Sequence, residues 1–182
     1  MKIIFLDIDG VLNTYQTFKD IKLEEELTGI RRVAIDLDKV LLLKEIVDKT
    51  GAKLVLSSDW RKHGKMKKGR LCTKNQNLFD ILSILFDNGL NIYDITPRLR
   101  KENRELEIRK WLDDNRDLNI ESFIVLDDED FDLHGFKNEL VKTMFIATDG
   151  NGNYNPSLSG LTRTHVDEAI MKLNNSKQLI KK

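Results

Sequence analysis

Apolar and polar positions follow each other along this chain in a way that predicts strands and helices in turn. Short apolar runs, which are typical of buried parallel strands, occupy 2–6, 53–56, 91–96, 122–126 and 140–147. Apolar residues recur at helical spacing over 36–49, 78–86, 103–115 and 161–173. Strands that alternate with helices predict an α/β fold with a mainly parallel five-stranded sheet and right-handed crossovers.

Two stretches and the C-terminal end do not fit this alternation. Residues 13–32 have no clean period and carry an acidic cluster, so we expect an irregular loop or flap near the first strand. Residues 61–70 hold a run of basic side chains and no acid, and we expect a loop there. Residues 177–182 are expected to form a frayed basic tail.

Length, charge and cysteine content limit the possible classes of protein. The 182 residues suit one domain, 1–182, because no repeat or linker divides them. The 30 basic and 30 acidic residues cancel, so net charge favours neither a nucleic-acid nor a membrane partner. No apolar run approaches the roughly 20 residues of a membrane span. The single Cys72 fits a reducing compartment, and we therefore expect a cytoplasmic protein.

The first strand leads directly into two carboxylates, Asp7 and Asp9, and then Gly10. In an open α/β sheet, ligands bind at the carboxyl ends of the strands. Two carboxylates this close repel each other unless a cation or a proton lies between them. Magnesium prefers oxygen ligands and is often shared with a substrate phosphate, so this stretch predicts a Mg²⁺ site. Asp and Gly are also ordinary turn formers, and the opening alone does not decide between the two interpretations.

Two later strand ends supply further polar groups. Ser57 and Ser58 follow the second strand, and Asp127 and Asp128 follow the fourth, where five of six positions are acidic. So many acids after a buried strand are costly unless they meet a cation or solvent. Parallel pairing would bring the ends of strands one, two and four together at one edge of the sheet.

These stretches, taken in order, resemble the four motifs of the haloacid dehalogenase (HAD) superfamily: Asp7-x-Asp9-Gly10-Val11, Ser57, a basic residue at the start of the helix over 103–115, and Asp127-Asp128. More narrowly, several stretches are similar to small HAD domains of RNA-repair proteins and to the phosphatase domain of phage polynucleotide kinase-phosphatases: residues 9–13, 57–61, Arg104 with Glu107-Ile108 and Trp111-Leu112, and 126–128. The resemblance covers roughly residues 2–161. It implies a Rossmann-like three-layer sandwich. The superfamily usually carries a cap domain after the first motif or between the second and third, but neither interval is long enough here for an independently folded one, so we expect a minimal cap.

The resemblance also implies a role for each motif. Asp7 would be the nucleophile that forms an aspartyl-phosphate, and Asp9 the general acid and then the general base. Mg²⁺ would be held by Asp7, by the backbone carbonyl of Asp9 and by Asp128, with Asp127 beside it. Ser57 would donate a hydrogen bond to phosphate oxygens.

The third motif and the substrate contacts are less defined. This motif is usually a lysine in the superfamily, whereas here the helix position favours Arg104, with Lys101 about one turn earlier, and the choice stays open. Asp132 matches a second acid that orients the site. The remaining substrate contacts are expected from Gly10, Ser58, Arg61 and Lys62.

Three hypotheses about function follow. The first is a Mg²⁺-dependent phosphomonoesterase that removes a 3'-terminal phosphate from a nucleic acid, since the basic run over 61–70 suits a polynucleotide end. The second is a nucleotidase or small-metabolite phosphatase, in which the flap over 13–32 closes over the substrate. The third is a non-catalytic anion-binding module, which the presence of both Asp7 and Asp9 disfavours. The sequence gives no oligomeric state.

Overall fold

A computed structural model describes residues 1–100 and 102–175, in which the five predicted strands form one parallel sheet. Its strands lie in the order β5-β2-β1-β6-β7. Their bounds are β1 (Lys2–Leu6), β2 (Lys53–Leu56), β5 (Ile92–Ile95), β6 (Ser122–Asp127) and β7 (Leu140–Lys142). The first strand of the chain is therefore the central strand of the sheet.

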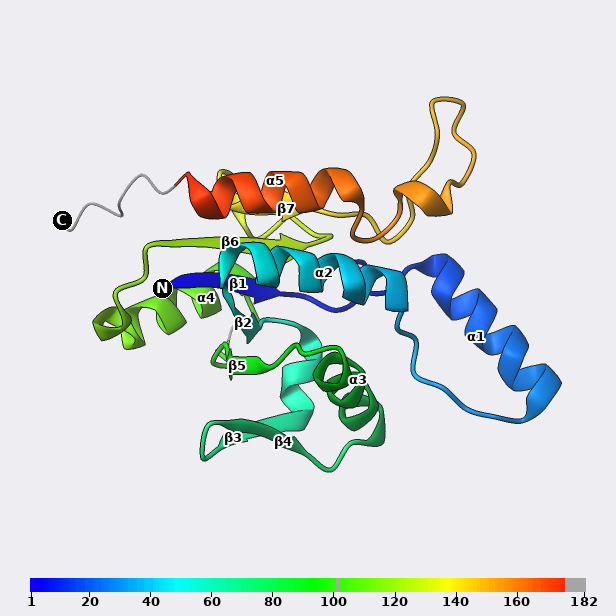
Figure 1. Cartoon of the computed structure of the whole chain (residues 1–182), viewed down its shortest axis with the longest axis horizontal. Helices are drawn as coiled ribbons and strands as arrows, with labels where there is room; N and C mark the ends of the chain where they lie inside the picture. Colours follow the sequence, from blue (N-terminus) through cyan, green and yellow to red (C-terminus); the bar gives the residue numbers. More distant parts are fainter. Residues whose placement is uncertain (101, 176–182) are drawn as a thin grey trace.

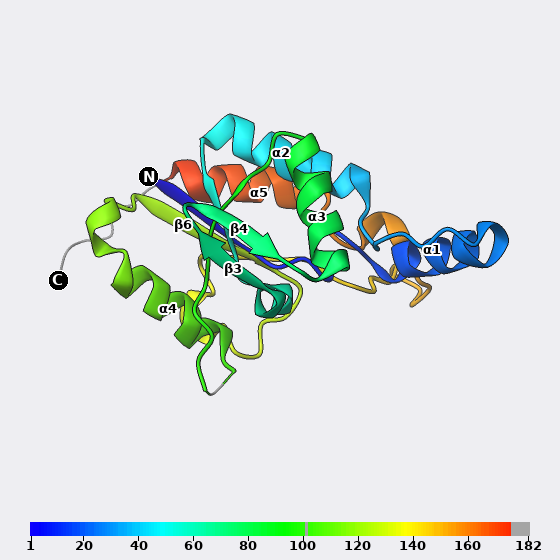
Figure 2. The same ribbon diagram turned by 90° about the horizontal axis from the view of Figure 1, so that it is seen from below.

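Helices cover both faces of the sheet (Figures 1 and 2). One face carries α2 (Leu37–Thr50), α3 (Gln76–Asp87) and α5 (Arg163–Asn174), and the other carries α4 (Arg104–Asp114). Side chains alternate between the two faces along a strand, so Leu6 packs into the first core, while Phe5 packs with Ile108 and Trp111 in the second. This arrangement confirms the predicted α/β fold, a Rossmann-like three-layer sandwich.

The register of the central strands brings three strand ends together. Leu6 pairs with Leu56 on one side and with Leu126 on the other. The backbone N–H of Asp7 donates to the Leu126 carbonyl at 2.9 Å, and that of Ser57 to the Leu6 carbonyl at 2.8 Å. The residues that follow these strands therefore emerge side by side at one edge of the sheet.

The prediction of an irregular loop over 13–32 was wrong for most of that stretch. A helix, α1 (Tyr15–Thr28), begins after Thr14, whose side chain caps its N-terminus, and ends at Gly29. None of its residues is buried, and the helix extends away from the sheet (Figures 1 and 2). A helix that buries no face leaves no apolar stripe in the sequence, which is why the periodicity missed it.

The basic run over 61–70 is also more ordered than expected. It comprises a short 3-10 helix, η1 (Asp59–His63), and an antiparallel hairpin of β3 (Gly64–Lys67) and β4 (Arg70–Thr73). Lys68 and Gly69 form the turn, both with positive φ, as a two-residue hairpin turn matched to the twist of the strands requires. Polar alternation on a mostly exposed hairpin gave no apolar pattern to detect.

Smaller differences concern lengths and faces. The fifth strand ends at Lys142 rather than 147, and it lies at the edge of the sheet as predicted. Phe86 and Leu106, two apolar residues of the predicted helices over 78–86 and 103–115, are exposed. Three further 3-10 turns are η2 (Arg116–Leu118), η3 (His134–Phe136) and η4 (Pro156–Leu158).

Asp36 caps the N-terminus of α2, because its side chain accepts a hydrogen bond from the Asp38 N–H at 2.9 Å. The predicted tail lies outside the described residues. Within them, no helix is both long and apolar enough to cross a membrane.

Candidate active site

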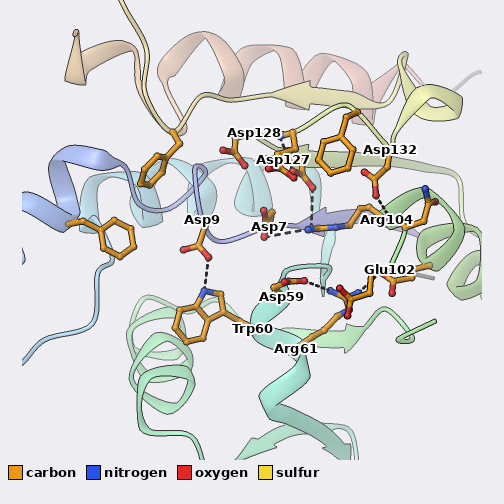
Figure 3. Close-up of a pocket in the computed structure, with 16 residues that line it drawn as sticks. Asp7, Asp9, Asp59, Trp60, Arg61, Glu102, Arg104, Asp127, Asp128 and Asp132 are labelled. Carbon is orange, nitrogen blue, oxygen red and sulfur yellow. Dashed lines mark hydrogen bonds and ion pairs between the residues drawn. The ribbon is translucent and has the colours of Figure 1, made fainter. Parts of the chain in front are cut away.

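A cavity of about 580 Å³ opens where the ends of β1, β2 and β6 meet (Figure 3). Acidic side chains dominate its wall and far outnumber the two arginines. The charged residues that line it are Asp7, Asp9, Asp59, Arg61, Glu102, Arg104, Glu107, Asp127, Asp128, Glu129 and Asp132. Because a phosphate would be repelled by such a wall, a cation is needed before a phosphate can enter.

Three of these acids form a tight cluster. Asp7, Asp127 and Asp128 each place a carboxylate oxygen within 4.8 Å of the others. Asp7 and Asp127 are buried and Asp128 is half-buried, so solvent reaches little of the group. Such a set of converging hard oxygen ligands suits Mg²⁺. The cluster thus fits the ion that the sequence predicts, with ligands from two distant parts of the chain.

Burial shifts the protonation of these carboxyl groups. It raises the pKa of Asp7 above its ordinary value, although Arg104 and a hydrogen bond from the Ser58 hydroxyl oppose the shift. Burial likewise raises the pKa of Asp127 to about 8, in spite of the neighbouring Arg104. The pKa of Asp128 rises to about 6 through burial and the charge of Asp7. These groups therefore resist ionising together unless a cation joins them.

Gly10 is the residue that allows the cluster to close. Its φ is +70°, a conformation that favours glycine, and a Cβ at this position would overlap the carboxyl group of Asp128. The Gly10 carbonyl accepts a hydrogen bond from the Thr143 hydroxyl at 2.7 Å. The backbone turn after β1 is thus fixed to the segment after β7, and no side chain fits between Gly10 and Asp128 in the loop after β6.

Arg104, at the start of α4, lies against the cluster. Its Nη1 is 3.1 Å from an oxygen of Asp127 and 3.6 Å from one of Asp7, and it also donates to the Ser57 carbonyl. Burial lowers the pKa of Arg104, but the surrounding carboxylates outweigh it and the pKa is raised. Asp132 accepts from the Arg104 backbone N–H at 2.6 Å and so holds the end of α4 at the site.

Asp9 lines the same cavity but is not part of the three-carboxylate cluster. One of its oxygens accepts from the Trp60 indole N–H at 3.0 Å, and the other from the Asn13 side-chain amide at 2.8 Å. Figure 3 shows Asp9 directed towards Trp60, apart from Asp7. The two predicted catalytic acids therefore have different surroundings: Asp7 is among carboxylates, and Asp9 is held by two neutral donors.

Arg61, which the sequence predicts to contact substrate, lies in the cavity wall but is almost wholly buried. Only 4% of it is exposed, and its guanidinium forms a buried ion pair with Glu107, in the first turns of α4. It also donates to the Ser58 carbonyl at 2.8 Å. Glu107 in turn accepts from the Leu99 N–H at 3.1 Å. Arg61 therefore joins η1 to α4 in the wall of the cavity.

Of the other residues predicted to contact substrate or phosphate, some lie near Asp7 and others lie away from the cavity. Lys62 does not line the cavity, and its amine pairs with Asp59 at 2.8 Å and Glu102 at 3.4 Å. The Ser57 side chain is fully buried and faces the Thr96 hydroxyl, 3.5 Å away. Ser58, in contrast, hydrogen-bonds to Asp7. Lys101 lies outside the described residues.

The sequence of this chain matches the family described as the HAD domain in Swiss Army Knife RNA repair proteins, over residues 3–152. The chain belongs to this family. No curated protein and no solved structure matches it. Membership supports a HAD-type hydrolase with a role in RNA repair. The matched range includes every cavity-lining residue described above, from Asp7 to Asp132. The α5 helix lies beyond the matched range.

Sequence reasoning missed three residues of the HAD domain's site. Trp60 and Asn13 hold Asp9, and Glu107 neutralises Arg61. The only available signal was their place within the stretches that resemble the family, since each partner is distant in sequence or lies in a turn. Spacing alone could not have paired Trp60 with Asp9, 51 positions away.

Proposed function

We propose that this HAD domain is a Mg²⁺-dependent phosphomonoesterase that removes a 3'-terminal phosphate from a polynucleotide. The observation that carries the proposal is the convergence of Asp7, Asp127 and Asp128 within 4.8 Å, with Arg104 against two of them. A strand-end aspartate beside a cation site and an arginine is suited to attack on phosphorus.

Asp7 is the nucleophile. Its carboxylate oxygen attacks phosphorus, an aspartyl-phosphate forms, and the bond from phosphorus to the leaving oxygen breaks. Asp7, Asp127, Asp128 and the Asp9 carbonyl would hold Mg²⁺, whose positive charge offsets the repulsion between carboxylate and phosphate. The tight packing of Gly10 against Asp128 supports the metal-binding role of this cluster, because it keeps the carboxylate oxygens close together.

Asp9 transfers the proton. In the first step it gives a proton to the leaving oxygen, which departs as a hydroxyl group, and in the second it takes a proton from the water that attacks the aspartyl-phosphate. Phosphate leaves and Asp7 is regenerated. The hydrogen bonds from Trp60 and Asn13 fix the direction of the Asp9 carboxyl group, so that one acid can serve both steps.

Arg104 stabilises the transferring phosphoryl group. Its planar guanidinium has five N–H donors, of which those that now face Asp7 and Asp127 can turn to phosphate oxygens. The Ser58 hydroxyl, which hydrogen-bonds to Asp7, is the better placed of the two serines to add a further donor.

The β3–β4 hairpin supports a polynucleotide as the substrate. Lys65, Lys67, Lys68 and Arg70 are all exposed on it, and none forms an ion pair with a described residue. The hairpin follows directly from η1, whose Asp59 and Trp60 line the cavity. Exposed basic side chains attract a phosphodiester backbone, and the hairpin carries them from η1 at the cavity towards the start of β5, where Arg70 lines a second pocket with Phe86 and Ile92. The alternative is a nucleotidase, since the cavity of about 580 Å³ has the size of a small-ligand site.

Phosphate release tests the proposal. Wild-type protein and Asp7→Asn are compared on an oligonucleotide with a 3'-phosphate, the same oligonucleotide with a 5'-phosphate, and mononucleotides, each with and without Mg²⁺. We expect Mg²⁺-dependent release from the 3'-phosphorylated oligonucleotide by wild type and none by the variant, with unchanged thermal unfolding. Turnover of mononucleotides alone would favour the nucleotidase, and absence of turnover on every substrate would favour an anion-binding module.

A further inference from the structure

Aromatic side chains complete the wall of the acidic cavity. Phe18 comes from α1 and Phe145 from the segment after β7, and both line the cavity with Asp7 and Asp9. Their ring centroids are 5.8 Å apart at an interplanar angle of 60°. Phe18 remains 43% exposed, and α1 buries none of its residues, so this ring does not serve to pack the helix into the core.

Hydrogen bonds to backbone groups connect the segments of both rings to the turn after β1, which carries Asp9 and Gly10. The Phe145 carbonyl accepts from the Tyr15 N–H at 3.3 Å, which ties the start of α1 to this segment. The Tyr154 hydroxyl accepts from the next N–H of the helix at 3.1 Å. Thr143, two residues before Phe145, donates to the Gly10 carbonyl at 2.7 Å. The aromatic pair is thus fixed to the turn that carries the proton-transferring Asp9.

We propose that Phe18 and Phe145 form a stacking site for the base of the nucleotide that carries the scissile phosphate. This inference rests on the proposed phosphatase function and adds to it a contact with the base of the terminal nucleotide. A sugar or an aliphatic alcohol has no flat π-face to place on these rings, whereas every nucleobase has one. The rings are tied to the loop of Asp9, which protonates the leaving oxygen, so the stacked base belongs to the leaving group.

Stacking of a base on an aromatic side chain is worth about 1–3 kcal/mol by alanine substitution, which is roughly 5- to 150-fold in affinity. Because the contact uses the face of the base rather than its edge, the site would accept all four bases. The hairpin and the aromatic pair would therefore bind different parts of one strand: the hairpin its backbone, and the rings its terminal base.

A comparison of two substrates tests this site. One is a short oligonucleotide with a 3'-phosphate, and the other is the same oligonucleotide with an abasic 3'-terminal residue. We expect Phe18→Ala to lower kcat/KM about 10-fold on the first and less than about 2-fold on the second. Phe18→Trp should restore activity on the first. Phe86→Ala removes an exposed ring on α3, outside this cavity, and should change neither.

Two kinetic results would overturn the stacking site. Equal loss on both substrates would mean that Phe18 only supports α1, and no loss on either would mean that it does not touch substrate. A binding measurement separates these results from failure of the proposed function. If wild type hydrolyses nothing, fluorescence anisotropy with the two oligonucleotides in their 3'-hydroxyl forms still decides. Base-dependent binding that Phe18→Ala weakens supports the site, and equal binding by both proteins overturns it.

Discussion

Two arginines line the same cavity, and the structure gives them opposite roles. Arg61 is buried in the wall of the cavity, and its charge is neutralised by Glu107 and, at 3.7 Å, by Asp59. Arg104 faces a cluster in which several carboxylates compete for one guanidinium. The first region is balanced in itself, so it has no charge left for a ligand. The second carries an excess of negative charge, and its balance requires a cation.

The comparison indicates which charged residues of the site stabilise the fold and which act on the substrate. A protein loses stability when one partner of a buried ion pair is removed, because the other charge is left buried without a counter-charge. A charge that acts on the reacting group instead affects turnover more than folding. The variants below separate the two effects, in order from the largest expected change to the smallest.

Removal of the Glu107 charge should have the largest effect on folding. Glu107→Gln leaves Arg61 buried without its nearest counter-charge, and we expect the free energy of unfolding to fall by about 3–5 kcal/mol. Urea unfolding measures this change. The double variant Arg61→Met/Glu107→Gln removes both charges and should recover most of the loss, while the Gln carbonyl can still accept from the Leu99 N–H. A double variant no more stable than the single one would show that the ion pair is not the cause.

Removal of the Arg104 guanidinium should act on turnover. We expect Arg104→Ala to lower kcat/KM for the 3'-phosphorylated oligonucleotide about 10²- to 10³-fold, as for loss of one strong donor to the transition state. Arg104→Lys should retain part of the activity, because it keeps the charge but not the planar fork. Arg61→Met/Glu107→Gln is the matched control with activity near wild type. Equal loss of activity in both proteins would contradict the division between the two arginines.

The carboxylate cluster should make the metal-free protein less stable as the pH rises. The pKa of Asp127 is 3.8 in its ordinary state and about 8 in the folded protein. Between these values the unfolded chain loses this proton and the folded state keeps it, so the free energy of unfolding falls from about pH 4 to pH 8.

Saturating Mg²⁺ should remove most of this pH dependence, because the bound cation favours the ionised carboxylates. Asp127→Asn should flatten the metal-free curve without added ion. Thermal unfolding over this pH range, with and without Mg²⁺, checks both statements. If the free energy of unfolding of the metal-free protein rises with pH, or if Mg²⁺ leaves its pH dependence unchanged, the cluster is not a cation site.

The smallest effect is expected where a neutral donor only positions an acid. Trp60→Phe removes the N–H that binds Asp9 but keeps most of the ring. We expect kcat to fall about 10-fold with little change in KM, since a misdirected acid affects the chemical step rather than binding. Trp111→Phe removes a comparable hydrogen bond, to Asp94 at 2.7 Å and away from the cavity, and should leave kcat unchanged. A loss confined to KM in Trp60→Phe would assign Trp60 to substrate binding instead.

The sequence predicted the sheet and the residues at its edge well, for a physical reason. A buried parallel strand needs a continuous apolar run, and a strand end that leads to a ligand site carries polar residues, so both leave local signals. The convergence of Asp7 with Asp127 and Asp128 followed from parallel pairing alone. Elements that bury little, such as α1 and the basic hairpin, left no such pattern.

The roles of individual charges were harder to predict because their partners are distant in sequence. Arg61 stands in a basic run, and only its contact with Glu107, 46 positions away, shows that it is not free to bind a phosphate. The hydrogen bond from Trp60 to Asp9 spans 51 positions. Such pairs depend on how helices lie on the sheet, which composition and periodicity do not determine.

The most direct test of the central claim is to trap the covalent intermediate. Wild-type protein is mixed with Mg²⁺ and a 3'-phosphorylated oligonucleotide, quenched in acid within one turnover, digested and analysed by mass spectrometry. We predict a phosphoryl group on the peptide that contains Asp7, and none when Asp7→Asn is treated in the same way. Phosphate release by wild type with no phosphorylated peptide, or with the phosphoryl group on another residue, would contradict the account.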